Sequence, residues 1–254
     1  MFFKDRKTVK DLIVRAGRGE AEAEFELAKR YMSGKGVKVD VLKAAELFED
    51  SAKHGCMQAQ LEAGDIYYNG IDDVLNGKLI NRDYTKAAYY YEKAVENGAE
   101  LTDDLCLQLG TVYRWGEYGI EEDPKKSVFW LLKPAENGNV TAQSMIAGCH
   151  YILEDKENAL LWAKKAAERG GQDEMCSLGA MYQDFGDYEN ALIWYKKSAA
   201  MNDSFALFAL GEMYLKGDGV EKDLKTAETY FRKSAELGYE EAEQALIQHF
   251  GKTN

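Results

Sequence analysis

Two stretches of this sequence decide its fold: LAKRYMSGKGVKVDVLKA at residues 27–44 and LGEMYLKGDGVEKDLKTA at residues 210–227. Both contain, in the same order and at the same spacing, a small residue, a tyrosine, two glycines, an aspartate and a final alanine. They lie near opposite ends of the chain. Self-similarity of this kind predicts a repeat protein built from one small structural unit.

The motif of a small residue followed three positions later by a tyrosine occurs six times. Residues three positions apart lie on one face of a helix, so the small residue lets a second helix approach and the tyrosine fills the space beside it. The motif therefore predicts the first helix of each unit. The tyrosines are Tyr31, Tyr67, Tyr113, Tyr151, Tyr182 and Tyr214.

An aspartate four residues before a small residue follows each of these tyrosines. Its carboxylate can accept hydrogen bonds from the exposed N–H groups that open a helix, and it faces the positive end of the helix dipole. Pro124, directly after one aspartate, fits the first helical position. These residues predict the start of the second helix of each unit: Asp40, Asp83, Asp123, Asp155, Asp187 and Asp223.

The second helix is predicted to have a fixed length, because a glycine or asparagine lies eleven residues after the small residue in every unit. Gly and Asn are the usual left-handed residues at helix C-termini. These residues are Gly55, Gly98, Gly138, Gly170, Asn202 and Gly238. One turn after the small residue, most units carry an aromatic residue or leucine, namely Phe48, Tyr91, Leu131, Tyr195 and Phe231.

The expected fold class is all-α: an α/α superhelical solenoid of about six helix-pair repeats with a half-repeat at each end. Only 2 prolines occur in 254 residues, which favours long helices. We expect one domain over residues 1–254. It would contain a half-repeat at 1–19, repeats at 20–55, 56–98, 99–138, 139–170, 171–202 and 203–238, and a capping half-repeat at 239–254.

The run L-G-x-x-Y-x-x-G-x-G-V-x-x-D-x-x-K-A, matched at residues 27–44 and 210–227, closely resembles the Sel-one-like repeat family, a relative of the tetratricopeptide repeats. Repeats 139–170 and 171–202, which have short turns, look like plain tetratricopeptide repeats. The resemblance implies a superhelix that acts as an adaptor or scaffold for other proteins.

The net charge of the chain limits the classes of partner that we expect. The formal net charge of −12 disfavours nucleic acid and anionic lipid surfaces, so the expected partner is a protein or peptide with basic residues. The N-terminal sequence MFFKDRKTVK has no apolar run of the kind found in signal peptides. We therefore expect a cytoplasmic protein without membrane insertion. We also expect a monomer.

No catalytic, cofactor or metal site is predicted, and we expect no enzymatic activity. The 3 histidines are scattered, and the four cysteines lack the short regular spacing of metal sites or disulfide frameworks. A hydrolase, as discussed for secreted cysteine-rich relatives of the family, is the alternative. Cys149 and Cys176 are placed on the inner surfaces of neighbouring first helices, where we expect two small apolar residues that fill the wall of the groove. A thiol pair that cross-links slowly in oxidant is the alternative. The tryptophans Trp130, Trp162 and Trp194 are predicted to be core.

The expected binding surface is the concave face, which the first helices line in related folds. Offsets of one and four after the motif glycine or alanine, and of three and six before it, point to that face. The candidate partner-binding residues are Glu22, Phe25, Lys29, Met32, Asp65, Tyr68, Asp104, Leu107, Arg114, Asp173, Gln183, Phe208 and Glu212. Acids outnumber bases among them. The convex face and the loop at residues 69–83 are the alternative surfaces, and nucleic-acid binding by a helical repeat is the alternative function.

Overall fold

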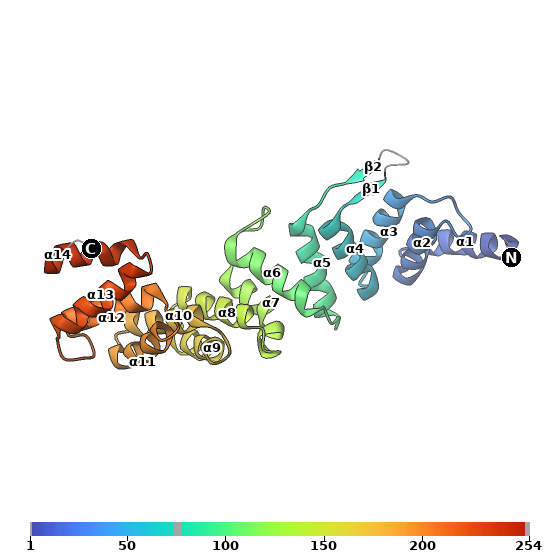
Figure 1. Ribbon diagram of the computed structural model, residues 1–254. Helices are drawn as coiled ribbons and strands as arrows, with labels where there is room; N and C mark the ends of the chain where they lie inside the picture. The colour runs from blue at the N-terminus through green and yellow to red at the C-terminus, as the bar shows by residue number, and fades with distance from the viewer. Residues whose placement is uncertain (1, 74–77, 252–254) are drawn as a thin grey trace. The chain divides into compact units, whose positions relative to one another are not determined.

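The computed structural model describes residues 2–73 and 78–251 (Figure 1). Residues 1 and 252–254, at the ends of the expected half-repeats, and residues 74–77, in the expected loop, lie outside the described residues.

Helices dominate the fold, and they follow one another as the expected pairs. After α1 (Phe2–Ala16), the first helices of the pairs, here called A-helices, are α2 (Ala21–Ser33), α4 (Met57–Asn69), α6 (Asp103–Trp115), α8 (Val140–Ile152), α10 (Gln172–Asp184) and α12 (Ser204–Lys216). The second helices, here called B-helices, are α3 (Val41–Lys53), α5 (Tyr84–Glu96), α7 (Pro124–Glu136), α9 (Lys156–Arg169), α11 (Tyr188–Ala199) and α13 (Leu224–Glu236). The chain closes with α14 (Glu240–Phe250). The predicted fold class is confirmed.

The chain forms two compact units. The N-terminal unit comprises Met1–Leu105 and Trp115–Glu122, and the C-terminal unit comprises Cys106–Arg114 and Asp123–Asn254. Within the N-terminal unit α2 packs on α3 and α4 on α5, and within the C-terminal unit each helix from α7 to α14 packs on the next (Figure 1).

The six predicted aspartates are the N-caps of the six B-helices. Each side chain accepts a hydrogen bond from a backbone N–H two or three residues later. In five pairs the backbone N–H of this aspartate also donates to the carbonyl of the motif tyrosine, whereas Asp155 donates to His150 instead. The aspartate therefore fixes both the turn between the two helices and the start of the second one.

The motif glycines sit where the B-helix comes closest. A Cβ atom on Gly64, Gly179 or Gly211 would lie 2.6–2.8 Å from a ring carbon of the aromatic residue in the paired B-helix. Those aromatic residues, Tyr91, Tyr195 and Phe231, are at most 1% exposed. The motif thus works as predicted, with the glycine making room for the ring. Tyr151 departs from the expectation that the motif tyrosine is packed away, because 40% of it is exposed.

One predicted helix terminus is wrong. Gly170 is not left-handed, since its φ is −86°. Helix α10 begins two residues later, at Gln172, and the Glu174 carboxylate accepts a hydrogen bond of 2.8 Å from the N–H of Gly171. That contact supports the chain with extended backbone, so no left-handed residue is needed. The other five predicted C-terminal residues all have positive φ.

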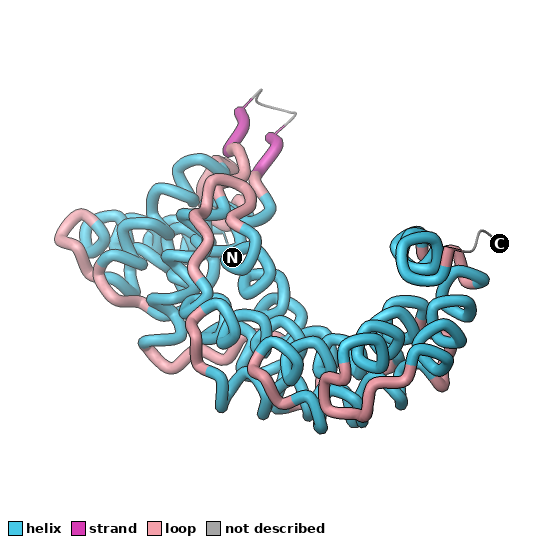
Figure 2. The backbone as a smooth tube through the Cα atoms, turned by 90° about the vertical axis from the view of Figure 1, so that its left-hand side faces the viewer, coloured by secondary structure: helices cyan, strands magenta, loops and turns pink. Residues whose placement is uncertain are grey.

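The loop after α4 contains a feature that the sequence did not predict. Strands β1 (Ile71–Asp73) and β2 (Lys78–Ile80) pair antiparallel, with Ile71 opposite Ile80 (Figure 2). Gly70, with φ of 70°, turns the chain out of α4 into the hairpin. The long insertion therefore has its own backbone hydrogen bonding.

Apolar layers between the helices hold the pairs together. Trp130, Trp162 and Trp194 are 2%, 7% and 8% exposed, as expected for core residues. At the N-terminus Val9 and Leu12 of α1 pack on Leu27 of α2. At the other end Leu246 of α14 joins the cluster around Phe231. Each terminal half-repeat therefore covers the apolar face of its neighbour.

Candidate protein-binding surface

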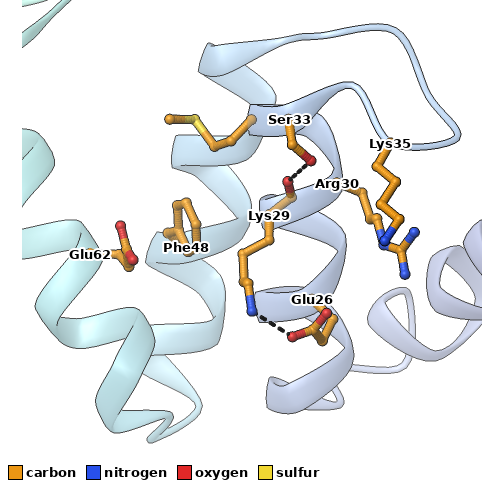
Figure 3. Close-up of a pocket in the computed structure, with 8 residues that line it drawn as sticks. Glu26, Lys29, Arg30, Ser33, Lys35, Phe48 and Glu62 are labelled. Atoms are coloured by element: carbon orange, nitrogen blue, oxygen red, sulfur yellow. Dashed lines mark hydrogen bonds and ion pairs between the residues drawn. The ribbon is translucent and has the colours of Figure 1, made fainter.

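A pocket of about 440 Å³ opens in the N-terminal unit, on the side of the A-helices α2 and α4 (Figure 3). We call this surface, with the neighbouring tyrosines described below, the A-face. The pocket is lined by Glu26, Lys29, Arg30, Met32, Ser33, Lys35, Phe48 and Glu62. Two of the predicted partner-binding residues, Lys29 and Met32, are among them.

On the α2 side of the pocket, Lys29 forms an ion pair within its own helix. The Lys29 ammonium lies 2.9 Å from a Glu26 carboxylate oxygen (Figure 3). It also lies 5.0 Å from the ring centroid of Phe25. Phe25 in turn packs on Phe48, with 5.7 Å between the ring centroids. Lys29 is therefore held over an aromatic base, and Met32 is left as the exposed apolar residue of this wall.

The α4 side of the pocket is different, because two carboxylates lie one helical turn apart there. Partial burial of Glu62, together with the nearby charge of Asp65, raises the pKa of Glu62, and Lys29 offsets this only in part. Asp65 accepts a hydrogen bond of 2.6 Å from the Tyr91 hydroxyl. Burial above all, and then that contact, raise the pKa of Tyr91, so the phenol stays a donor. Glu62 and Asp65 are thus the acidic part of the A-face, although Lys29, Arg30 and Lys35 line the same pocket as Glu62.

Tyrosine rings continue the A-face beyond the carboxylates. Tyr68 lies edge-on to Tyr84, with ring centroids 5.3 Å apart, and Tyr84 lies 4.6 Å from Tyr118. Tyr118 is 65% exposed and has a φ of 55°, a left-handed conformation that few residues with side chains adopt. An exposed aromatic surface therefore adjoins the acidic one.

In the C-terminal unit, most of the predicted residues already have contacts within the chain. Gln183 accepts a hydrogen bond of 2.8 Å from the Tyr195 hydroxyl, and Glu212 pairs with Lys216. Phe208 packs on Phe231 and Tyr239. Leu107 packs against the core, and the Arg114 guanidinium lies beside Gly148. Asp173 is exposed on α10.

All thirteen predicted partner-binding residues keep some exposure, and none is fully buried. The exposed members are Glu22, Lys29, Met32, Asp65, Asp104 and Asp173. The sequence reasoning missed Glu62 and Glu26, which lie two residues before a motif glycine or alanine, an offset it did not count. Their spacing of three residues from Asp65 and Lys29 is the signal that could have identified them.

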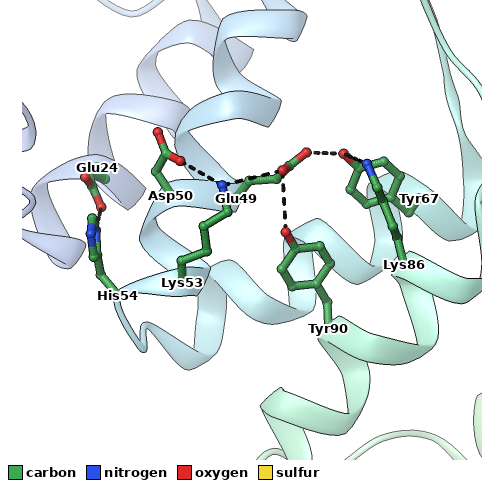
Figure 4. A network of polar contacts seen from close by, with 8 residues as sticks. All are labelled: Glu24, Glu49, Asp50, Lys53, His54, Tyr67, Lys86 and Tyr90. Carbon is green, nitrogen blue, oxygen red and sulfur yellow. Dashed lines mark hydrogen bonds and ion pairs between the residues drawn. The ribbon is translucent and has the colours of Figure 1, made fainter.

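A second polar cluster in the N-terminal unit is structural. Glu49 of α3 accepts hydrogen bonds from the hydroxyls of Tyr67 and Tyr90, and Lys86 donates to the Tyr67 oxygen over 3.2 Å (Figure 4). Burial raises the pKa of both tyrosines, which keeps them protonated as donors. The cluster ties α3 to α4 and α5.

The expected packing of the two cysteines as small apolar residues is confirmed, because Cys149 is 0% and Cys176 8% exposed. Residues 2–73 and 78–251 contain no group of three or more His, Cys, Asp and Glu side chains placed to hold a metal ion. Among the helices described, none combines the length and apolarity that a membrane span requires.

The comparison with family models agrees with the geometry of the helix pairs. The Sel1 repeat model matches residues 21–56, 58–98, 104–139, 150–171, 175–203 and 204–239. The chain belongs to the Sel1 repeat family. The resemblance read from the motif is thereby confirmed. Sel1 repeats are in general non-catalytic scaffold repeats, and they support protein–protein interaction as the general role of this chain.

Known proteins give the same picture. A Sel1 repeat protein from Oxalobacter formigenes is 25% identical, with a TM-score of 0.57, covering 96% of this chain and 70% of that one. A protective antigen of uropathogenic Escherichia coli with the same repeat fold is 29% identical, with a TM-score of 0.51 over 94% of this chain and 52% of that one. An F-box protein of Arabidopsis thaliana is 30% identical over 122 residues. Those residues make up 48% of this Sel1 repeat chain and 30% of the plant protein.

Proposed function

We propose that this Sel1 repeat protein is an adaptor that binds a basic segment of a partner protein on the A-face of its N-terminal unit. The observation that carries the proposal is the pair Glu62 and Asp65. The raised pKa of Glu62 shows that its charge is disfavoured in the free protein. A lysine or arginine of a partner would favour that charge, so binding would be selective for a cation.

Apolar contacts would supply most of the affinity. Met32 is 41% exposed beside the carboxylates, and Tyr68, Tyr84 and Tyr118 offer rigid rings close by. Aromatic residues are enriched among the residues that dominate binding energies, whereas rim charges mainly set encounter rate and partner choice. The expected segment therefore carries a basic residue next to an apolar or aromatic one. Exposed Glu22 and Asp104 add to the acidic field.

Affinity capture from the native cell tests the proposal. The A-face variant combines Glu62→Gln, Asp65→Asn and Asp104→Asn, which removes charge while keeping side-chain size. A matched control, Glu46→Gln, Glu100→Gln and Glu189→Gln, removes the same charge from exposed positions elsewhere. Proteins recovered with wild type and the control but lost with the A-face variant support the proposal. Equal recovery with all three proteins, at unchanged thermal stability, would place the binding surface elsewhere.

The pH dependence of binding gives an independent test of the role of Glu62. Because a bound cation lowers its pKa, binding releases a proton, and the affinity for a captured partner should rise as pH increases through the raised pKa. Titration calorimetry between about pH 4 and pH 7 measures this, since the ordinary pKa of Glu is about 4.3. In the Glu62→Gln variant the dependence should flatten. An unchanged pH profile would contradict the assignment.

A monomeric state and a cytoplasmic location are part of the proposal. Multi-angle light scattering of the purified chain and fractionation of the native cell test them. A dimer, or recovery outside the cytoplasm, would overturn the corresponding statement.

A further inference from the structure

A second surface of this protein lies on the B-helices of the C-terminal unit. At one repeat position, two residues after the small residue, α7, α9 and α11 carry Phe129, Leu161 and Ile193. Their exposed fractions are 54%, 49% and 49%. The three helices follow one another in the same layer (Figure 1). Large, half-exposed apolar residues at equivalent positions of three successive B-helices form a row. Exposed apolar patches of this kind on soluble proteins mark interaction sites.

Lysines flank this row on each helix. Lys133 follows on α7, Lys164 and Lys165 on α9, and Lys196 and Lys197 on α11, all exposed and three or four residues after the apolar residue. That spacing puts them on the same outer face of each helix. Residues 129–133, 161–165 and 193–197 contain these five lysines and no carboxylate. We call the three apolar residues and five lysines the B-face.

Four of the five lysines are available to a partner. Within the part of the chain that the structure describes, Lys164, Lys165, Lys196 and Lys197 make no ion pair. Lys165 and Lys197 lie over the rings of Trp162 and Trp194, 3.8 and 3.7 Å from the centroids. These contacts orient the two lysine side chains without neutralising their charge.

The local charge is opposite to that of the chain as a whole. Helices α7, α9 and α11 together carry nine basic and four acidic residues, whereas the formal net charge of the protein is −12. A surface that is basic against this background attracts an acidic ligand and disfavours the basic segment proposed for the A-face.

We propose that the B-face is a second docking site, which binds an acidic amphipathic helix of a partner protein. Apolar residues seven positions apart lie on one face of a helix and recur about every 10 Å along it, because a helix rises about 1.5 Å per residue. A helix laid across α7, α9 and α11 would present such a row to Phe129, Leu161 and Ile193. Glu or Asp beside those residues would face the lysines. The protein would then join a basic segment on one surface to an acidic helix on another.

A synthetic helical peptide of three heptads tests the proposal directly. It carries leucine at every seventh position and glutamate at the flanking positions, and a matched peptide has lysine in place of each glutamate. Fluorescence anisotropy with the full-length protein should show binding of the glutamate peptide and at least about tenfold weaker binding of the lysine peptide, since several ion pairs reverse together. Equal affinity for both peptides, or no binding of the glutamate peptide, would overturn the proposal.

Variants locate the site. Replacing Lys164, Lys165, Lys196 and Lys197 by Glu should weaken binding of the glutamate peptide by at least about tenfold. Replacing exposed Lys10, Lys38, Lys222 and Lys225 by Glu makes the same change in net charge and should leave the affinity for the glutamate peptide nearly unchanged. Leu161→Ser with Ile193→Ser should also weaken binding of this peptide. Equal losses in both lysine variants would show a non-specific charge effect and reject the site.

Anionic vesicles test the competing occupant. Vesicles of phosphatidylserine and phosphatidylcholine should not retain the protein at physiological salt, because the acidic remainder of the chain is repelled from an anionic surface. Retention that depends on Lys164, Lys165, Lys196 and Lys197, without binding of the glutamate peptide, would make the B-face a membrane surface instead. Neither outcome bears on the proposed A-face site. The B-face lysine variant should still capture A-face partners normally.

Discussion

At the scale of single residues, the motif glycines of this Sel1 repeat protein differ in what faces them. A Cβ atom on Gly211 would lie 2.6 Å from a Phe231 ring carbon, whereas one on Gly148 would meet the Arg114 guanidinium, with Nη2 at 3.6 Å and Nε at 3.9 Å. The difference follows from sequence, because the aromatic residue of α9, Trp162, lies one position earlier than its counterparts. The ring that the glycine accommodates elsewhere is therefore absent opposite Gly148.

Alanine substitutions at these two positions should have opposite effects. Gly211→Ala should lower the free energy of unfolding by about 1–3 kcal/mol, because the added methyl group overpacks against Phe231. Gly148→Ala should raise it by about 0.5–1 kcal/mol, because alanine is the better helix former and the space is open. Chemical denaturation of both variants measures the changes. Similar shifts of one sign would show that the aromatic contact does not decide the role of the glycine.

The cysteine of α10 should be chemically inert in the folded protein. Burial, and then the nearby charge of Asp203, raise the pKa of Cys176 to about 12. The thiolate is the reactive form, so at pH 8 only roughly one thiol in ten thousand would be reactive. Iodoacetamide should therefore label Cys176 only after denaturation, as read by mass spectrometry. Rapid labelling of the native protein would show that this region opens.

At the scale of helices, the sequence predicted what repeats and missed what is particular to one unit. The aspartate caps and the glycine approaches were predictable, because local hydrogen bonding and helix periodicity determine them. Gly170 was mispredicted, because Glu174, a residue of the next helix, supports the chain there. The hairpin of β1 and β2 was missed, because a pair of three-residue strands has little periodicity to detect.

The aspartate caps should make the stability of the protein sensitive to acid. Hydrogen bonds from Asn190 and Thr226 lower the pKa values of Asp187 and Asp223. Their ionised forms therefore stabilise the folded state above the ordinary Asp pKa of about 3.9. This stabilisation is lost as pH falls through the lowered folded-state values.

Asp187→Asn with Asp223→Asn should reduce the fall in melting temperature between about pH 6 and pH 3. Asp218→Asn, which removes an acid that caps no helix, is the control and should follow wild type. Differential scanning fluorimetry across this pH range compares the three proteins. Identical curves for all of them would mean that other groups determine the acid sensitivity.

At the scale of the whole molecule, the sequence predicted the exposure of residues better than their contacts. The offsets from the motif glycine placed thirteen residues that all keep some exposure. They could not show that Gln183 and Glu212 already have partners within the chain, because those contacts depend on side-chain conformation. Nor could they show that partial desolvation and the nearby charge of Asp65 raise the pKa of Glu62. Packing of neighbouring helices, which no single-helix pattern contains, determines both.

The two compact units should unfold as separable steps, because repeats interact mainly with their neighbours. Tryptophan fluorescence distinguishes the units: Trp130, Trp162 and Trp194 are buried in the C-terminal unit, whereas Trp115 of the N-terminal unit is 59% exposed. Gly211→Val should therefore shift the fluorescence transition to lower denaturant concentration. Part of the far-ultraviolet circular dichroism change should stay at the wild-type midpoint.

Gly64→Val supplies the reciprocal variant, because its added side chain would collide with Tyr91 in the N-terminal unit. It should shift part of the circular dichroism change and leave the fluorescence midpoint nearly unchanged. If either variant moves both signals together, the two units fold as one cooperative body. A partner bound on the A-face would then stabilise the B-face as well, whereas separable unfolding means that each surface can be loaded without affecting the other.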